Sequence, residues 1–169
     1  MSTSDLVFEY RPIGIIHSSH TVSKETPIQP VFAGGCLGWA EIQPEYTEGL
    51  QDLEGFSHVH LLTHLDRAGP GIMQVKPFMD TRLRGLFATR HPCRPNPIGL
   101  SLVELVAVEG SILRLKGIDI LDQTPLFDIK PFIPRFDQCQ DVRGGWTDAV
   151  DDQQAQKRGV RRFVKGDNA

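Results

Sequence analysis

The chain has 169 residues, of which 40% are hydrophobic and 23% are charged, with a formal net charge of −3. This length and composition are typical of one globular domain with its own core, and no apolar run approaches the ~20 residues of a membrane helix. The slightly acidic balance excludes a uniformly basic, nucleic-acid-coating surface. The N-terminus, MSTSDLVFEY, has no signal-peptide pattern.

The three cysteines, Cys36, Cys93 and Cys139, are widely spaced and form no CxxC pair. An odd number of isolated cysteines is typical of reduced thiols and not of a disulfide framework or a zinc site. We therefore expect a cytoplasmic protein.

Short β-like runs separated by Gly and Pro dominate the chain. Residues 18–35 form a long polar loop, which in a compact domain favours a functional or mobile segment. Residues 44–53 predict a short helix with Thr47 as its N-cap. Strands are predicted over residues 10–17, 36–42, 56–63, 84–89, 100–106, 111–118 and 126–133.

This succession of short strands, with little helical periodicity before residue 140, favours an all-β fold. We expect mainly antiparallel strands in a single small β-barrel, or a sandwich, with a few short helices. The barrel domain is predicted over residues 1–140. A C-terminal segment with a basic tail follows over residues 141–169.

Polar side chains crowd into residues 85–134, most of them close to a Gly or Pro. A small-molecule site needs such rigid backbone, because its orienting groups must be fixed before the ligand arrives. The alternative is a rigid crossover in which arginines pair with aspartates and a threonine caps a turn. The residues alone therefore predict a polar site for a charged small molecule and leave its function open. The candidates are Arg90, Arg94, Asn96, Asp119, Asp122, Thr124, Asp128 and Lys130.

The sequence lacks the motifs of metal sites, serine nucleophiles and the usual nucleotide-binding folds. His58 and His60 would project from one face of a strand, but no further ligand pattern accompanies them, so we expect no metal site. The sequence contains no GxSxG, P-loop or GxGxxG pattern, which argues against a serine nucleophile and the usual nucleotide folds.

The end of the chain is strongly basic. Between residues 153 and 166 there is no acidic residue. Taken alone, such a run is most often a solvated terminal segment. The alternative is contact with nucleic-acid phosphates, which clustered cations bind by releasing counterions. The basic residues are Lys157, Arg158, Arg161, Arg162 and Lys165.

Four blocks of sequence stand out together: PIGIIHS (12–18), GFSHVHLL (55–62), GLFATRHPCRPNPIGLSLVEL (85–105) and DILDQTPLFDIKPFIP (119–134). In combination they resemble the TsaA-like, or TrmO-type, tRNA methyltransferase family, over residues 8–137. The resemblance implies a single-sheet β-barrel that works as a homodimer. It also implies that S-adenosylmethionine is used to methylate the N6 nitrogen of N6-threonylcarbamoyladenosine at position 37 of tRNA.

The resemblance also implies site residues. Asp122 and backbone groups would hold the ribose or adenine of the cofactor, and Leu100 would give the adenine an apolar wall. Methyl transfer from a sulfonium needs no metal, since alignment of the reacting atoms supplies most of the rate. The implied cofactor residues are Gln29, Pro30, Asp66, Arg67, Arg90, Leu100, Asp122, Gln123, Thr124 and Pro125.

Two alternative pairs of residues are candidates for contact with the acceptor base. Either Asp128 and Lys130, or Arg94 and Asn96, would position the modified adenine or accept its N6 proton. In this context the basic tail becomes a candidate contact for tRNA.

Three positions depart from the family's usual pattern. Asp66 stands where a His is common, Gln123 where a Gly is usual, and Phe132 where a Tyr is found. Cofactor binding is still expected, and two alternatives to the tRNA reaction remain. One is a non-catalytic nucleotide- or RNA-binding barrel, and the other is a methyltransferase for another small-molecule or RNA acceptor.

Overall fold

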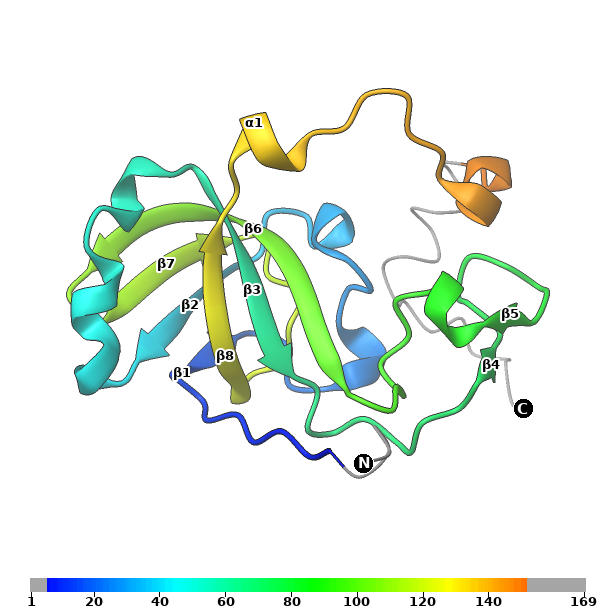
Figure 1. Ribbon diagram of the computed structural model, residues 1–169, viewed down its shortest axis with the longest axis horizontal. Helices are drawn as coiled ribbons and strands as arrows, with labels where there is room; N and C mark the ends of the chain where they lie inside the picture. The colour runs from blue at the N-terminus through cyan, green and yellow to red at the C-terminus, as the bar shows by residue number, and fades with distance from the viewer. Residues whose placement is uncertain (1–5, 152–169) are drawn as a thin grey trace.

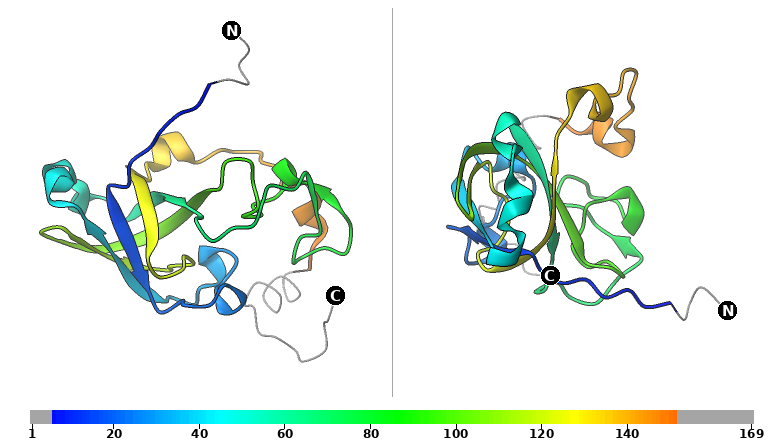
Figure 2. Two further views of the ribbon diagram at one scale, coloured as in Figure 1. Left: turned by 90° about the horizontal axis from the view of Figure 1, so that it is seen from below. Right: turned by 60° about the vertical axis from the view of Figure 1, so that its left-hand side comes forward.

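The computed structural model describes residues 6–151. Six strands of this range are β1 (Gly14–Ser18), β2 (Leu37–Ile42), β3 (His58–His64), β6 (Ile98–Glu109), β7 (Ile112–Lys116) and β8 (Thr124–Pro131). They close into a barrel in the order β1-β2-β7-β6-β3-β8, and all neighbours are antiparallel. Figures 1 and 2 show these strands curling around a common interior. The predicted all-β, mainly antiparallel barrel is confirmed.

Alternating side chains explain why the strands close around a core. Along β3, Val59, Leu61 and Thr63 are buried, and the residues between them are partly exposed. Successive side chains of a strand point to opposite faces, so one face of each strand supplies the barrel interior. The core contains Ile16, Ala40, Ile42, Val59, Leu61, Val103, Leu105, Leu113, Leu115, Ile118 and Leu126.

Between β3 and β6 the chain leaves the barrel and forms a separate lobe, residues 65–97, which we call the excursion (Figure 1). Its two short strands, β4 (Gln74–Val75) and β5 (Arg84–Gly85), pair with each other and not with the barrel. The excursion therefore places its polar loops beside one end of the barrel.

The predicted strand over residues 84–89 is wrong beyond Gly85. Leu86–Ala88 forms a 3-10 helix instead, and the Thr89 hydroxyl donates a hydrogen bond of 2.7 Å to the carbonyl of Leu86. A short apolar run suits a strand or a buried helical turn equally well, so periodicity alone could not decide.

All described helices are short. The predicted helix after β2 exists as a 3-10 helix, Pro44–Leu50, but Thr47 is not its N-cap. Gln43 precedes the first turn, which Pro44 begins because proline needs no N–H partner there. The other helices are Ser23–Glu25, Pro30–Phe32, Leu53–Gly55, α1 (Pro134–Asp137) and Gly145–Ala149. In residues 6–151, none is long and apolar enough to cross a membrane.

Candidate functional site

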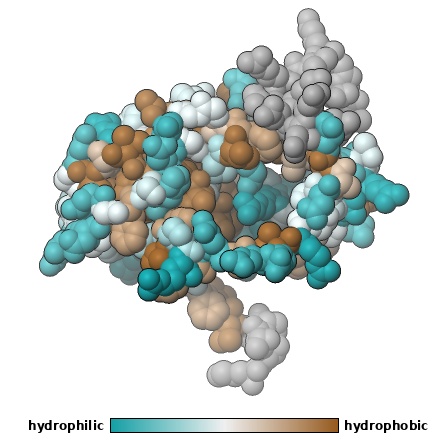
Figure 3. All heavy atoms as spheres, turned by 90° about the horizontal axis from the view of Figure 1, so that it is seen from above, coloured by the Kyte–Doolittle hydropathy of each residue, from teal (hydrophilic) through white to brown (hydrophobic). Residues whose placement is uncertain are grey.

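A cleft opens at one end of the barrel, beside the excursion. The carboxyl ends of β1, β3 and β7 meet the amino ends of β6 and β8 there, because neighbouring strands are antiparallel. The cleft has a volume of about 550 Å³, which is typical of a small-ligand site. Seen from above, the surface is hollowed between the barrel and the excursion (Figure 3). The lining comes from segments 23–29, 63–69, 89–94, 98–101 and 119–124.

Two buried hydroxyls and one carboxyl of the cleft, those of Thr63, Ser101 and Asp119, lie on or beside the barrel strands β3, β6 and β7. Ser101 Oγ donates a hydrogen bond of 2.6 Å to Asp119 Oδ1. Thr63 is 1% exposed, and its Oγ1 has no partner among the described residues. A Cβ at Gly99 would collide with this hydroxyl, so only glycine leaves it room. Because an unpaired buried hydroxyl costs free energy, Thr63 marks a place for a polar ligand atom or a water.

The carboxyl of Asp119 has an altered acidity. Burial raises the pKa of Asp119 from 3.8 to about 6, while the hydrogen bond from Ser101 and the charge of Arg90 limit the rise. At neutral pH the group is therefore mostly ionised but still able to take up a proton. Perturbed carboxyls in clefts are typical of functional sites.

Two arginines supply positive charge on the excursion side of the cleft. Arg90 Nη1 donates a hydrogen bond of 2.6 Å to Gln29 Oε1, which ties the long loop to the excursion. Arg94 Nη1 donates to the carbonyl of Thr89 at 2.9 Å. The guanidinium of Arg94 also lies 5.6 Å from the centre of the Phe87 ring. The Arg94 side chain is thus positioned by a backbone carbonyl and by the Phe87 ring. Among the described residues, it does not form the arginine–aspartate pair that the crossover alternative predicted.

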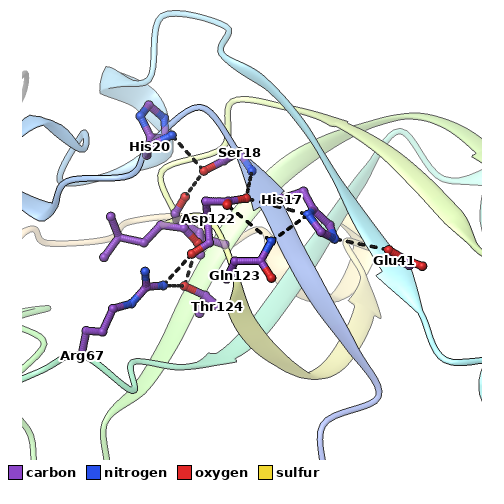
Figure 4. Close-up of polar contacts among 10 residues, drawn as sticks. His17, Ser18, His20, Glu41, Arg67, Asp122, Gln123 and Thr124 are labelled. Carbon is purple, nitrogen blue, oxygen red and sulfur yellow. Dashed lines mark hydrogen bonds and ion pairs between the residues drawn. The ribbon is translucent and has the colours of Figure 1, made fainter.

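Arg67 anchors the loop between β7 and β8 (Figure 4). Its Nη2 donates to the carbonyl of Asp122 at 2.7 Å and to Thr124 Oγ1 at 2.9 Å. Thr124 Oγ1 donates in turn to the carbonyl of Leu121 at 2.7 Å, which closes the turn. Asp66 lies beside this arginine, with 3.4 Å between Asp66 Oδ1 and Arg67 Nε. The pair thus connects the excursion to the end of the barrel.

The carboxylate of Asp122 faces β1 and not the cleft (Figure 4). Its Oδ1 accepts a hydrogen bond of 3.1 Å from the Ser18 N–H and lies 3.8 Å from His17 Nδ1. The His17 ring stacks on Trp39 with 4.9 Å between centroids. In this arrangement the Asp122 side chain fixes the shape of the loop.

Gln123 occupies the position where the family pattern has glycine. Its φ of 64° lies in the left-handed region, which glycine adopts without steric cost. Its Nε2 lies 3.1 Å from His17 Nδ1 and 3.4 Å from Asp122 Oδ2. A residue other than glycine therefore adopts the left-handed conformation at this turn.

The structure brings only part of the predicted site together. Pro30, Asp122, Gln123 and Pro125 do not line the cleft, although each adjoins a lining residue in the chain. Of the predicted catalytic residues, Arg94 lines it. The predicted cofactor residues in the lining are Gln29, Asp66, Arg67, Arg90, Leu100 and Thr124.

The other three predicted catalytic residues lie elsewhere. Asp128 and Lys130 pair with Leu62 and His60 of β3 on the outer face of the barrel. Lys130 Nζ and Asp128 Oδ2 form an ion pair of 2.8 Å. Asn96 is exposed and is absent from the lining of the cleft. This placement separates all three from the cleft.

Sequence reasoning gave no specific role to three residues that the cleft brings together. Asp119 stood among the polar candidates, but the resemblance gave the cofactor role to Asp122 and none to Asp119. Ser101 lies within the block 85–105 but received no role, Thr63 lies just outside the block 55–62, and their inward register on β3 and β6 could have indicated both.

No group of three or more His, Cys, Asp or Glu side chains suited to a metal ion occurs within residues 6–151. Within this range, His58 Nδ1 lies 3.0 Å from Ser57 Oγ, and the His60 ring packs against Phe132 with centroids 5.8 Å apart. His60 Nδ1 is buried without a hydrogen-bond partner among the described residues, and the expectation of no metal site stays a prediction.

The predicted nucleic-acid contacts of the tail lie outside the described residues. They are Lys157, Arg158, Arg161, Arg162 and Lys165.

Comparison with known proteins assigns the family. Residues 15–138 match the tRNA-methyltransferase O N-terminal domain. The chain therefore belongs to the TrmO family, as the four sequence blocks predicted.

Two relatives and one solved structure show how far the similarity extends. The chain is 51% identical over 141 residues to a probable S-adenosyl-L-methionine-binding protein of Pyrococcus abyssi, covering 83% of this chain and 77% of that protein. It is 36% identical over 151 residues to the human tRNA (adenine(37)-N6)-methyltransferase, covering 84% of this chain and 33% of that protein. The crystal structure of TrmO from Pseudomonas aeruginosa matches with a TM-score of 0.70 and 38% identity, covering 83% of this chain and 62% of that one. The chain thus spans only part of each relative's length.

Proposed function

We propose that this protein is a methyltransferase that uses S-adenosylmethionine to methylate N6 of N6-threonylcarbamoyladenosine at position 37 of tRNA. The observation that carries the proposal is the cleft, which gathers six expected cofactor residues around the Ser101–Asp119 pair in a chain of the TrmO family. The names of the relatives add support. One states S-adenosylmethionine binding and the other states tRNA adenine methylation.

The residues of the cleft fit this cofactor in charge and polarity. Asp119 offers a negative charge to a sulfonium or ammonium group, and Arg67 and Arg90 offer cations to a carboxylate. Leu100 gives adenine an apolar surface, and Thr63 Oγ1 is free to bond a polar atom. When bound, the cofactor supplies an electrophilic methyl group.

The residues of this chain would then orient the acceptor and handle its proton. Alignment of the acceptor nitrogen with the methyl group supplies most of the rate, so fixed groups matter more than acid–base strength. Arg94 lines the cleft and would hold the carboxylate of the threonylcarbamoyl group. Asp119, with a pKa of about 6, is ionised at neutral pH and would accept the N6 proton.

Mass spectrometry of nucleosides tests the proposal after incubation of the chain with S-adenosylmethionine and tRNA carrying the threonylcarbamoyl group. We expect one added methyl group on that nucleoside, and none on tRNA that lacks the modification. Arg94→Ala should lower the rate at least tenfold. Arg114→Ala is the matched control, because Arg114 pairs with Glu109 on the barrel surface and should keep its activity.

A second candidate is a barrel that binds S-adenosylmethionine without transferring its methyl group. The name of the P. abyssi relative favours it, since that name states binding alone. This candidate predicts normal cofactor binding with no methylated nucleoside from any RNA offered.

The homodimer and the cytoplasmic location remain predictions of the sequence. Sedimentation of the purified chain would check the first of them.

A further inference from the structure

A second cavity of about 550 Å³ lies beside the cleft, between the excursion and the 3-10 helix Gly145–Ala149. The two cavities share a wall formed by Ile28, Gln29 and residues 89–92. Their linings differ in character. Within the described residues, the cleft contains no Phe, Tyr or Trp, whereas the second cavity is lined by Phe78, Phe87 and Trp146.

The Trp146 ring of this cavity is held in place. Trp146 Nε1 donates a hydrogen bond of 2.7 Å to the carbonyl of Ala88. The guanidinium of Arg84 lies 5.6 Å from the centre of the Trp146 ring, and Arg84 Nη2 pairs with Asp80 at 2.6 Å. A ring fixed in this way loses little entropy when a planar ligand stacks on it.

The two phenylalanines of the cavity remain accessible. Phe87 is 75% exposed and Phe78 is 49% exposed. Large apolar side chains gathered at a cavity mark a binding surface, because their exposure to water is unfavourable. Exposed ring faces of this kind suit a planar ligand, which buries apolar area when it stacks.

The charge around the cavity favours a nucleic acid. The excursion carries six Lys and Arg residues against two Asp, although the whole chain has a net charge of −3. Arg90 lines the cavity itself, and Arg84 and Arg94 lie over its rings. Unpaired RNA bases typically bind to aromatic rings surrounded by such cations.

We propose that the second cavity is the subsite for the acceptor base, a purine of single-stranded RNA that stacks on Phe78, Phe87 or Trp146. The inference rests on the proposed function, because it needs the cofactor in the neighbouring cleft. The two ligands then meet beside Gln29 and Arg90, which line both cavities, and the N6 edge of the base faces the cleft that Asp119 lines. Methyl transfer requires the acceptor nitrogen within about 3–3.5 Å of the methyl carbon, so the sites must adjoin.

Alanine substitutions at the exposed rings test this subsite by kinetics. Phe87→Ala and Phe78→Ala should each lower kcat/KM for an anticodon stem-loop RNA with N6-threonylcarbamoyladenosine by roughly tenfold or more, as lost base stacking does. The Kd for S-adenosylmethionine should stay within about twofold. Phe87→Tyr keeps the ring and should restore activity. Phe136→Ala is the matched control, because Phe136 is 72% exposed on α1 and lines neither cavity.

Tryptophan fluorescence tests the subsite without turnover. The chain has two tryptophans, Trp39 and Trp146, so Trp39→Phe leaves a single reporter in the cavity. We expect the same RNA to quench Trp146, with or without cofactor, and Phe87→Ala in this background to raise the Kd at least tenfold. Unchanged fluorescence, or equal kcat/KM in Phe87→Ala, Phe78→Ala and Phe136→Ala, would overturn the inference. A wild-type protein that fails to bind S-adenosylmethionine but still shows the quench would instead refute the proposed function.

Discussion

Ser101 Oγ lies 2.6 Å from Asp119 Oδ1, where the inward face of β6 meets the segment after β7. The serine donates its hydrogen to the carboxyl and so favours the ionised form, while burial favours the protonated form and is the stronger effect. The balance places the pKa of Asp119 at about 6. This pair therefore links the stability of the fold to the charge of the cleft.

The first prediction concerns stability and pH. Between about pH 4 and pH 6 the folded protein holds a proton on Asp119 that the unfolded chain has lost. The free energy of unfolding should therefore fall as pH rises through this window, by about 3 kcal/mol at most. Asp119→Asn removes the titration and still accepts from Ser101. Urea unfolding at pH 4 and pH 7 should show the variant gaining stability over wild type only at pH 7.

Ser101→Ala is a companion to this experiment. Loss of the hydrogen bond raises the pKa of Asp119 further, so the decline in stability should extend to higher pH. If wild type and Asp119→Asn had the same pH profile, Asp119 would not titrate as described.

The second prediction concerns Arg67, which bonds to both Asp122 and Thr124. Arg67→Ala should free the loop between β7 and β8 and weaken S-adenosylmethionine binding roughly tenfold, about 1.4 kcal/mol. Arg67→Lys should recover only part, because a lysine lacks the planar fork of donors. Calorimetric titration measures both. Equal affinity in wild type, Arg67→Ala and the exposed control Arg135→Ala would show that the loop needs no anchor.

The third prediction concerns the left-handed residue Gln123. Gln123→Gly should be as stable as wild type or more stable by about 0.5–1 kcal/mol, since glycine adopts this φ without cost. Gln123→Val should be less stable by about 1–2 kcal/mol, because a β-branched side chain is the least tolerant of it. Thermal unfolding of the three proteins gives their order. A valine variant as stable as the glycine variant would contradict the backbone conformation.

The fourth prediction concerns the basic tail. Reversing two charges with Arg161→Glu and Arg162→Glu should weaken tRNA binding and leave S-adenosylmethionine binding unchanged. Each lost phosphate contact should reduce the slope of log K against log salt by about 0.7–0.9. Filter binding at several salt concentrations measures this slope. Unchanged tRNA affinity would contradict this prediction and indicate that the tail is a solvated terminal segment that does not contact tRNA.

The barrel was predictable because its signal is local. Alternation along residues such as Val59, Leu61 and Thr63 reports one buried face without knowledge of the partner strand. The prediction of a strand over residues 84–89 was wrong beyond Gly85 because the structure there depends on contacts between distant segments. Leu86 is buried within the excursion and not in a sheet. A short apolar run is compatible with either environment, so the local sequence does not distinguish them.

The sequence predicted which segments surround the site but not which side chains line it. Sequence blocks located the loops that surround the cleft, but not the direction of each side chain. Asp122 turns to Ser18 and His17, whereas Asp119, three residues earlier, lines the cleft with Ser101. Asp128 and Lys130 lie outside the barrel because of their register opposite Leu62 and His60. Such choices depend on strand pairing between distant segments, which a single sequence does not show.

The most direct test of the account is calorimetric titration of the chain with S-adenosylmethionine, carried out on wild type, Arg90→Ala and Lys130→Ala. Arg90 lines the cleft and bonds to Gln29, whereas Lys130 lies on the outer face of the barrel. We predict micromolar binding, about −8 kcal/mol, weakened at least tenfold by Arg90→Ala and unchanged by Lys130→Ala. Absence of binding, or binding lost in Lys130→Ala but kept in Arg90→Ala, would contradict the assignment of the cleft as the cofactor site.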